Sequence, residues 1–196
     1  MTFPQTSSIP WGRVRESIER VQQRRERAVA ALEAAGIPYA IAGGNAVAAW
    51  VATVDPSATR FTRDVDLLVA RNTLDAVRTA LEAAGFRYRH ASGLDVFVDG
   101  KEGKAGDGVH LVFAAEQLRP EHPLPSPSLE ESKPDPGGRL VTLDALVRLK
   151  LNAYRRKDQM HLLDMINVGL LDQTWLTRVA PEHRDRLQAL LDDPDG

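Results

Sequence analysis

The chain has 196 residues, of which 25 are Lys or Arg, 27 are Asp or Glu and none is cysteine. This length suits one medium-sized domain with at most a small appendage, and 43% hydrophobic with 27% charged residues is typical of globular proteins. The lack of cysteine excludes disulfides, cysteine-ligated zinc and thiol catalysis. With no secretory leader and no membrane-spanning run, we predict a cytoplasmic protein without membrane contact. A net charge of −2 argues against broad coating of nucleic acid.

Up to residue 116, helical and strand patterns alternate and then three strand patterns follow one another. Apolar residues at helical spacing or in short alternating runs, bounded by glycine and polar residues, define these segments. We predict helices at 11–35, 45–54 and 72–83, and strands at 39–42, 61–69, 86–90, 94–98 and 109–113.

The second part of the chain begins with a proline-dense segment. Six of the 12 prolines lie between Pro120 and Pro136, so we expect 117–140 to be an ordered wrap or a linker without regular elements. Beyond it, Thr142 is expected to cap a helix that extends to Tyr154. Two further helical regions follow at 158–168 and 175–191.

These patterns predict an α+β fold, in which a mixed β-sheet is flanked by helices and followed by a helical C-terminal tail. The expected organisation has an N-terminal helix, a core, a proline-rich connection, and a helical region that packs on the core. The corresponding ranges are 1–36, 37–116, 117–140 and 141–196.

Gly43 and Gly44 stand where the strand at 39–42 gives way to a helix. Two glycines there allow a phosphate to approach the backbone and the helix N-terminus, whose free N–H groups and dipole favour an anion. A simple tight turn is the alternative. The segment is neither a Walker A loop nor a dinucleotide-binding G-x-G-x-x-G motif.

The strand at 61–69 carries two carboxylates, Asp64 and Asp66, which alternation places on one side of the strand. Such carboxylates lie about 7 Å apart, repel each other, and are costly beside a core unless a cation joins them. Hard oxygen ligands of this kind suit Mg²⁺ together with substrate phosphates. A solvent-facing edge strand with two surface acids is the alternative.

Lys150 lies in an apolar helical stretch, one turn before Ala153 and Tyr154. A lysine in this position could reach a triphosphate as a point charge. It could equally extend along the flank of the helix towards solvent.

A resemblance to a known family combines these motifs. Gly43-Gly44 after a strand, followed by Asp64-Val65-Asp66, resembles the nucleotidyltransferase superfamily with the DNA polymerase β-like fold. Within it, the chain looks most like the minimal bacterial group of AbiEii-type toxins. That group carries a Gly-Gly motif, an Arg-x-Thr-x-Asp-x-Asp motif, a Lys-x-x-Ala helix and a later Asp. The matching residues are Gly43 and Gly44, then Arg60, Thr62, Asp64 and Asp66, then Lys150 and Ala153, then Asp158 or Asp164.

The resemblance spans about residues 37–168, makes 37–116 a nucleotidyltransferase-like core, and implies transfer of a nucleoside monophosphate from an NTP. Asp64 and Asp66 would bind Mg²⁺, or Mn²⁺, and take part in catalysis. The acceptor would be a hydroxyl of RNA, a protein or a small molecule, and a toxin-like role with an antitoxin-like partner is a further hypothesis. The nucleotide-binding residues would be Gly43, Gly44, Asn45, Arg63 and Lys150.

The sequence departs from the family at one position, where many members have a third carboxylate on a later strand. Here the strand at 109–113 offers His110, which is a poor Mg²⁺ ligand but a workable general base near pH 7, so it joins the catalytic candidates. Asp95 or Asp107 would take this place if the register differs, and His110 could instead be a packed structural residue. A catalytically degenerate nucleotide-binding or regulatory module that acts with a partner protein is the remaining alternative.

Overall fold

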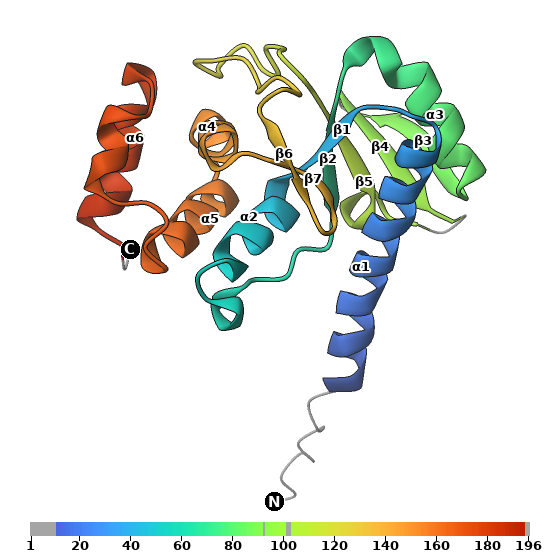
Figure 1. Ribbon diagram of the computed structural model, residues 1–196, viewed down its shortest axis with the longest axis horizontal. Helices are drawn as coiled ribbons and strands as arrows, with labels where there is room; N and C mark the ends of the chain where they lie inside the picture. Colours follow the sequence, from blue (N-terminus) through green and yellow to red (C-terminus); the bar gives the residue numbers. More distant parts are fainter. Residues whose placement is uncertain (1–10, 92, 101–102, 195–196) are drawn as a thin grey trace, which may run out of the picture.

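The computed structural model describes residues 11–91, 93–100 and 103–194. At its centre is a seven-stranded sheet in the order β3-β4-β5-β2-β1-β7-β6 (Figure 1). The strands are β1 (Tyr39–Ala42), β2 (Val65–Val69), β3 (Phe86–Ala91), β4 (Leu94–Asp99), β5 (Val109–Phe113), β6 (Ser132–Asp135) and β7 (Gly138–Val141). The β1–β7 and β2–β5 pairs are parallel and the other neighbours are antiparallel, which confirms the predicted mixed sheet.

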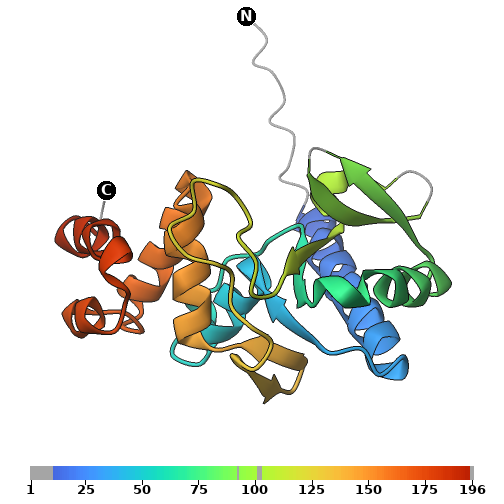
Figure 2. The ribbon, with the colours of Figure 1, turned by 90° about the horizontal axis from the view of Figure 1, so that it is seen from above.

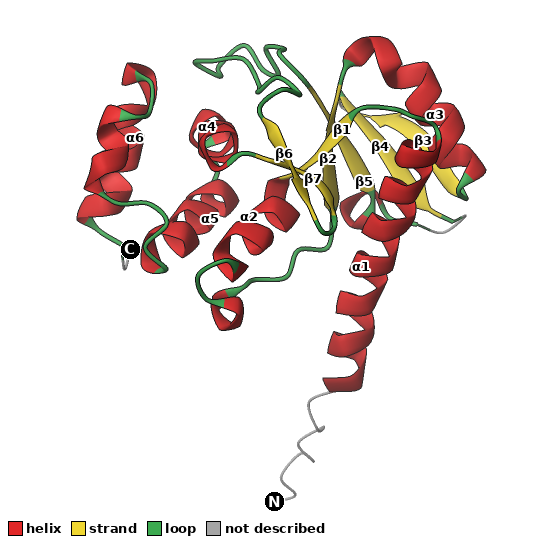
Figure 3. Ribbon diagram, viewed as in Figure 1, coloured by secondary structure: helices red, strands yellow, loops and turns green. Residues whose placement is uncertain are grey.

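Helices flank this sheet at both ends. They are α1 (Trp11–Ala34), α2 (Gly43–Ala52), α3 (Leu74–Ala83), α4 (Leu143–Ala153), α5 (Arg156–Asn167) and α6 (Pro181–Asp192), with short 3₁₀ turns at Pro56–Ala58, Arg71–Thr73, Ala105–Asp107 and Gln173–Thr177. Figures 1 and 3 show α1 and α3 beside β3, β4 and β5, whereas α4, α5 and α6 lie at the opposite end. The view from above in Figure 2 shows the same division. Among the described residues, no helix is both long and apolar enough to cross a membrane.

The hydrophobic core follows the periodicities of the sequence. Leu67 and Leu68 of β2 are both fully buried, so the central strand packs on both faces of the sheet. Leu32 of α1 and Leu81 of α3 are fully buried as well, because each stands on the apolar stripe of its helix. Burying one such leucine stabilises the fold by about 1.5–3 kcal/mol, so these positions fix how the helices meet the sheet.

The ends of α4 were predicted correctly, and they matter because this helix reaches the site described below. The Thr142 side chain accepts a hydrogen bond from the Ala145 N–H at 3.3 Å and caps the helix. The helix ends at Tyr154, which has the left-handed φ of 44°. α5 then starts at Arg156, so only a very short connection separates the two helices.

The proline-dense segment differs from the expectation, because it contains β6 and the start of β7. β6 is an edge strand that pairs with β7 alone, and an edge position tolerates Pro134, which has no N–H to donate. Gly138, with a φ of 122°, follows the turn of this hairpin. Leu140 of β7 pairs in parallel with Ile41 of β1. The hairpin at 132–141 is therefore an integral part of the central sheet.

The starts of β2 and α3, in the first half of the chain, also differ from the sequence prediction. β2 begins at Val65 and not at residue 61, because its antiparallel partner β1 ends at Ala42, opposite Asp66, where the chain turns into α2. Residues 61–64 therefore have no strand to pair with on that side. Asn72 lies in the 3₁₀ turn that precedes α3, so this helix begins at Leu74 and not at the predicted residue 72.

Candidate functional site

A cleft of about 420 Å³ lies where β2 and β5 meet the first turn of α2 and the facing ends of α4 and α5. Its lining brings together residues that are far apart in the sequence. Among them are Gly43, Asp64, Asp66, Asp95, His110, Glu116, Lys150, Arg155, Lys157 and Asp158. Gly43, Asp64, Asp66, His110 and Lys150 were all site candidates from the sequence, so the fold gathers most of the predicted set.

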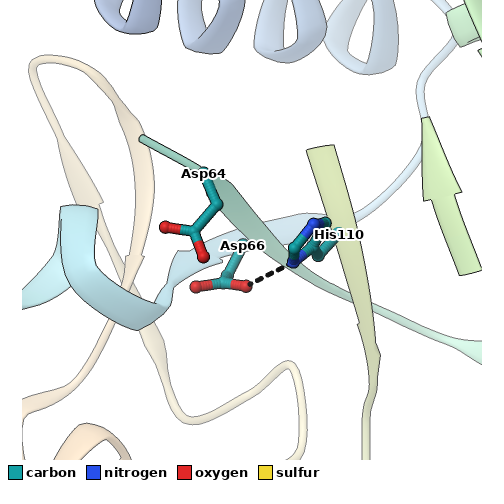
Figure 4. Close-up of side chains that lie close together, drawn as sticks. All are labelled: Asp64, Asp66 and His110. Atoms are coloured by element: carbon teal, nitrogen blue, oxygen red, sulfur yellow. Dashed lines mark ion pairs between the residues drawn. The ribbon is translucent and has the colours of Figure 1, made fainter. Parts of the chain in front are cut away.

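Two carboxylates and one imidazole converge on the cleft (Figure 4). Asp64 immediately precedes β2, Asp66 lies on β2, and His110 lies on the adjacent β5 directly opposite Asp66 in the strand register. One ligand atom from each of the three lies within 4.8 Å of the others, and His110 Nδ1 is 3.7 Å from Asp66 Oδ1. The parallel pairing of β2 with β5 is what places His110 beside the carboxylates.

The two glycines make room for this cluster. Gly43 has a φ of 60°, and a Cβ atom there would lie 1.7 Å from Asp66 Oδ2. A Cβ on Gly44 would lie 2.9 Å from the Cβ of Thr62. Gly43 is thus required both by its backbone conformation and by the close approach of Asp66. Gly44 does not line the cleft and serves the packing of Thr62.

The segment before β2 is held by side chains instead of a strand ladder. Arg60 Nε donates to Asp164 Oδ1 at 2.7 Å, which ties this segment to α5. The Thr62 hydroxyl donates to the Asp64 carboxylate, and Asn45 Nδ2 donates to the Asp64 carbonyl at 2.8 Å. The first half of the Arg-x-Thr-x-Asp-x-Asp motif therefore positions Asp64, and so does Asn45, which lies outside the cleft lining.

The two aspartates have opposite electrostatic environments. Burial raises the pKa of Asp64, but hydrogen bonds from Thr62 and Lys157 outweigh burial and lower it to about 2. For Asp66, burial together with repulsion from Asp64 raises the pKa, although Lys150 and His110 oppose this shift. The second carboxylate is therefore the one whose charge is left least compensated by the chain.

Lys150 forms the floor of the cleft. Only 6% of its side chain is exposed, and its ammonium lies 3.2 Å from Asp158 Oδ1, where Asp158 is 1% exposed. Arg155 also donates a hydrogen bond to Asp158, at 2.7 Å, so two cationic side chains contact this carboxylate. Burial lowers the pKa of Lys150, while Asp158 and Asp66 act in the opposite direction.

Lys157 is a charged cleft residue beside the aspartate pair that the sequence reasoning did not single out. Its ammonium lies 3.0 Å from Asp64 Oδ2 and 3.4 Å from Asp64 Oδ1, and about half of its side chain is exposed. The only local signal is the run Arg155-Arg156-Lys157-Asp158, in which Lys157 lies in the first turn of α5 next to the buried Asp158.

Three other candidates lie apart from the cluster. Arg63 is outside the cleft lining, and its largely exposed guanidinium is 3.8 Å from Asp107. Asp95 lines the cleft, but it accepts hydrogen bonds from Tyr88 at 2.5 Å and from His90 at 2.8 Å. Neither Asp95 nor Asp107 joins the group within 4.8 Å, so of the three third-position candidates only His110 lies beside the aspartate pair.

The donor set fits a divalent metal ion. Asp64 and Asp66 supply the hard oxygen ligands that Mg²⁺ and Mn²⁺ prefer, and His110 adds a nitrogen that Mn²⁺ accepts more readily than Mg²⁺. The raised pKa of Asp66 has the sign expected for a carboxylate that a cation would stabilise.

No family model and no curated protein matches the sequence. Among solved structures, an antigenic nucleotidyltransferase-like protein from Paracoccidioides brasiliensis aligns with a TM-score of 0.57 and 21% identity, over 89% of this chain and 88% of that chain. The chain therefore shares the fold of this nucleotidyltransferase-like protein, and at this identity the likeness concerns the fold alone.

Two further solved structures align with TM-scores below 0.5. JHP933 from Helicobacter pylori has 17% identity and a TM-score of 0.45, over 96% of this chain and 78% of that chain. ANT(2'')-Ia, solved in complex with adenylyl-2''-tobramycin, has 16% identity and a TM-score of 0.46, over 91% and 99%.

Proposed function

We propose that this chain is a metal-dependent nucleotidyltransferase, which moves a nucleoside monophosphate from an NTP to a hydroxyl group. One observation carries the proposal: Asp64, Asp66 and His110 converge within 4.8 Å in a cleft that also contains Lys150 and Lys157. Carboxylates for a divalent ion and ammonium groups for phosphates are the two parts that phosphoryl-type transfer needs.

Asp64 and Asp66 would hold Mg²⁺ or Mn²⁺, which supplies charge neutralisation on the phosphates when bound. The first turn of α2, which starts at Gly43, presents backbone N–H groups to the phosphates, and Lys150 contributes a fixed positive charge from the floor. Gly44 and Asn45 act indirectly, by holding the segment that carries Asp64. Arg63 contacts a nucleotide only if that nucleotide extends beyond the cleft lining.

In the proposed reaction, the acceptor oxygen attacks the α-phosphorus of the NTP and forms a new P–O bond. The bond from the α-phosphorus to the oxygen that bridges it to the β-phosphorus breaks, and pyrophosphate leaves. The acceptor proton passes to the imidazole of His110 on β5, which lies beside the carboxylate of Asp66 on β2. The acceptor is a hydroxyl of an RNA, a protein or a small molecule. A toxin-like role with an antitoxin-like partner is a further hypothesis, which applies if the acceptor is an RNA or a protein that is essential to the cell.

The test is incubation of the protein with each of the four labelled NTPs and Mg²⁺ or Mn²⁺, scoring label on RNA, on protein and on the chain itself. Asp64→Asn and Asp66→Asn remove one carboxylate charge at nearly constant shape, and each is expected to abolish transfer. Metal-dependent NTP binding that is equal in wild type and in both variants would refute the metal site.

One specific observation favours a second candidate, a nucleotide-binding module without turnover. The residue at the third position of the cluster is an imidazole and not a carboxylate. His110→Ala distinguishes the two candidates, because a large loss of rate with retained NTP binding is expected for a general base. Metal-dependent NTP binding by wild type without transfer to any acceptor class would establish the second candidate instead.

A further inference from the structure

Two lysines approach the aspartate pair, and they differ in their freedom to move. Lys150 is 6% exposed and is paired with Asp158, which Arg155 also contacts. A lysine held in this way cannot change partners without leaving buried charges unpaired. Lys157 is 48% exposed at its side chain, and the partner it contacts at 3.0 Å is Asp64, one of the two proposed metal ligands.

The Lys157 ammonium contacts both oxygens of the Asp64 carboxylate and lies within 3.4 Å of each. A divalent ion would use lone pairs of the same oxygens, and its charge would repel an ammonium group at this distance. Occupation of Asp64 by Lys157 therefore opposes metal binding to the protein without nucleotide.

A bound triphosphate changes this balance. It brings several negative charges into the cleft that Lys157 lines together with Asp64. A lysine is a compact point charge on a flexible four-carbon stem, so it can turn from a carboxylate to a phosphate without moving its helix. The long side chain begins in the first turn of α5, at the edge of the cleft.

We propose that Lys157 is an exchangeable counter-ion, which neutralises Asp64 in the nucleotide-free protein and transfers to the phosphates when a metal–nucleotide complex binds. The inference rests on the proposed function and adds a coupling to it. Lys157 weakens metal binding in the absence of nucleotide and strengthens nucleotide binding in the presence of metal. Because such coupling is reciprocal, nucleotide increases the affinity for metal by the same factor as metal increases the affinity for nucleotide.

The experiment uses the full chain and the variant Lys157→Gln, which keeps much of the length and removes the charge. Mn²⁺ binding without nucleotide is measured by electron paramagnetic resonance of the free ion. Binding of the four α,β-non-hydrolysable NTP analogues is measured calorimetrically at saturating Mn²⁺. Lys133→Gln is the matched control, because Lys133 lies 4.0 Å from the centre of the Trp50 ring and outside the cleft lining.

Opposite changes are expected for the two ligands. Loss of a half-exposed ion pair should raise Mn²⁺ affinity by about 2- to 5-fold. Loss of a charged contact to phosphate should lower analogue affinity by about 10-fold or more. Lys157→Arg, which keeps the charge, should restore most of the analogue affinity, and Lys133→Gln should change neither measurement.

Affinities for Mn²⁺ and for the analogue that fall together in Lys157→Gln would show that Lys157 only supports the fold, and would overturn the inference. Unchanged values for both ligands would overturn it as well. In these two cases wild type still binds Mn²⁺ and an analogue, so the proposed metal site survives. Wild type that binds neither would refute the proposed function, and the role of Lys157 with it.

Discussion

The floor and the rim of the cleft use the same kinds of charged residue, but in different surroundings. The floor consists of Gly43, Asp66, Lys150 and Asp158, of which Lys150 and Asp158 are almost fully buried and Gly43 lies directly against Asp66. The rim consists of Lys157 and the Arg71–Glu116 pair, whose side chains are between about one-third and one-half exposed. Buried charges resist any change of partner, whereas exposed charges exchange partners at little cost. We therefore expect the floor to keep its geometry when a ligand binds and the rim to rearrange.

The largest effect is expected at Asp66 of the floor. Asp66→Asn should lower nucleotidyl transfer by at least about 1,000-fold, because metal-based charge stabilisation contributes several kcal/mol to the transition state. The measurement is single-turnover transfer of labelled nucleotide at saturating metal, for wild type and variant. Residual transfer within about tenfold of wild type would mean that Asp66 is not a metal ligand.

The same substitution, Asp66→Asn, should lower activity but raise the stability of the metal-free protein. The pKa of Asp66 is raised in the folded protein, so the folded state binds this proton more tightly than the unfolded state does. Stability of the metal-free wild type therefore falls as pH rises from the unfolded pKa towards the folded one. With chelator present, Asp66→Asn should be the more stable protein above about pH 4, and thermal unfolding across pH measures this. Asp64→Asn is the control and should be less stable than wild type at neutral pH, because the pKa of Asp64 is lowered to about 2.

The second largest effect is expected at Asp158. Asp158→Ala leaves Lys150 buried and without its carboxylate, which should cost about 3–5 kcal/mol of unfolding free energy. Urea unfolding at neutral pH measures this loss. Replacing both partners, as Lys150→Met with Asp158→Leu, should recover most of the stability but not the transfer activity. A double variant as unstable as the single one would show that the pair itself stabilises the fold.

A steric prediction comes next in size. Gly43→Ala puts a Cβ atom 1.7 Å from the unsubstituted position of Asp66 Oδ2 and imposes a left-handed φ on an alanine. Overpacking and backbone strain together should cost about 2–4 kcal/mol. Because Asp66 has to move, transfer should fall even at temperatures where the variant is folded. Gly85→Ala is the matched control: it has a φ of 89° and open space around its Cβ, so it should show the strain without the loss of activity.

The floor was far more predictable from the sequence than the rim. Gly43, Asp64 and Asp66 belong to short local motifs, and strand alternation offered His110 as one candidate, whereas its position opposite Asp66 comes from the register of β5 with β2 in the structure. Lys157 contacts an aspartate 93 residues earlier, and no local pattern specifies such a pair. Lys150 was predicted to reach phosphates, but its partner Asp158 became evident only from the packing of α4 on α5.

The missed hairpin has a related explanation. Prolines usually interrupt strands, so the composition of 117–140 argued for an irregular connection. Whether a proline is tolerated depends on whether its strand lies at the sheet edge, and strand order is a property of the whole fold. Pro134 lies in the edge strand β6, where the N–H that proline lacks is not needed for a hydrogen bond between strands.

The smallest effect is expected at the rim pair of Arg71 and Glu116. Arg71 contacts Glu116 through two nitrogens, at 2.6 Å each, and also stacks over the Phe113 ring at 3.7 Å. Despite this geometry, a double-mutant cycle with Arg71→Met and Glu116→Gln should give a coupling of no more than about 1 kcal/mol, because both side chains are partly exposed. The coupling should shrink further in 1 M salt, where the screening length is about 3 Å. Coupling above about 3 kcal/mol, unaffected by salt, would place this pair with the floor and remove the distinction between the two regions.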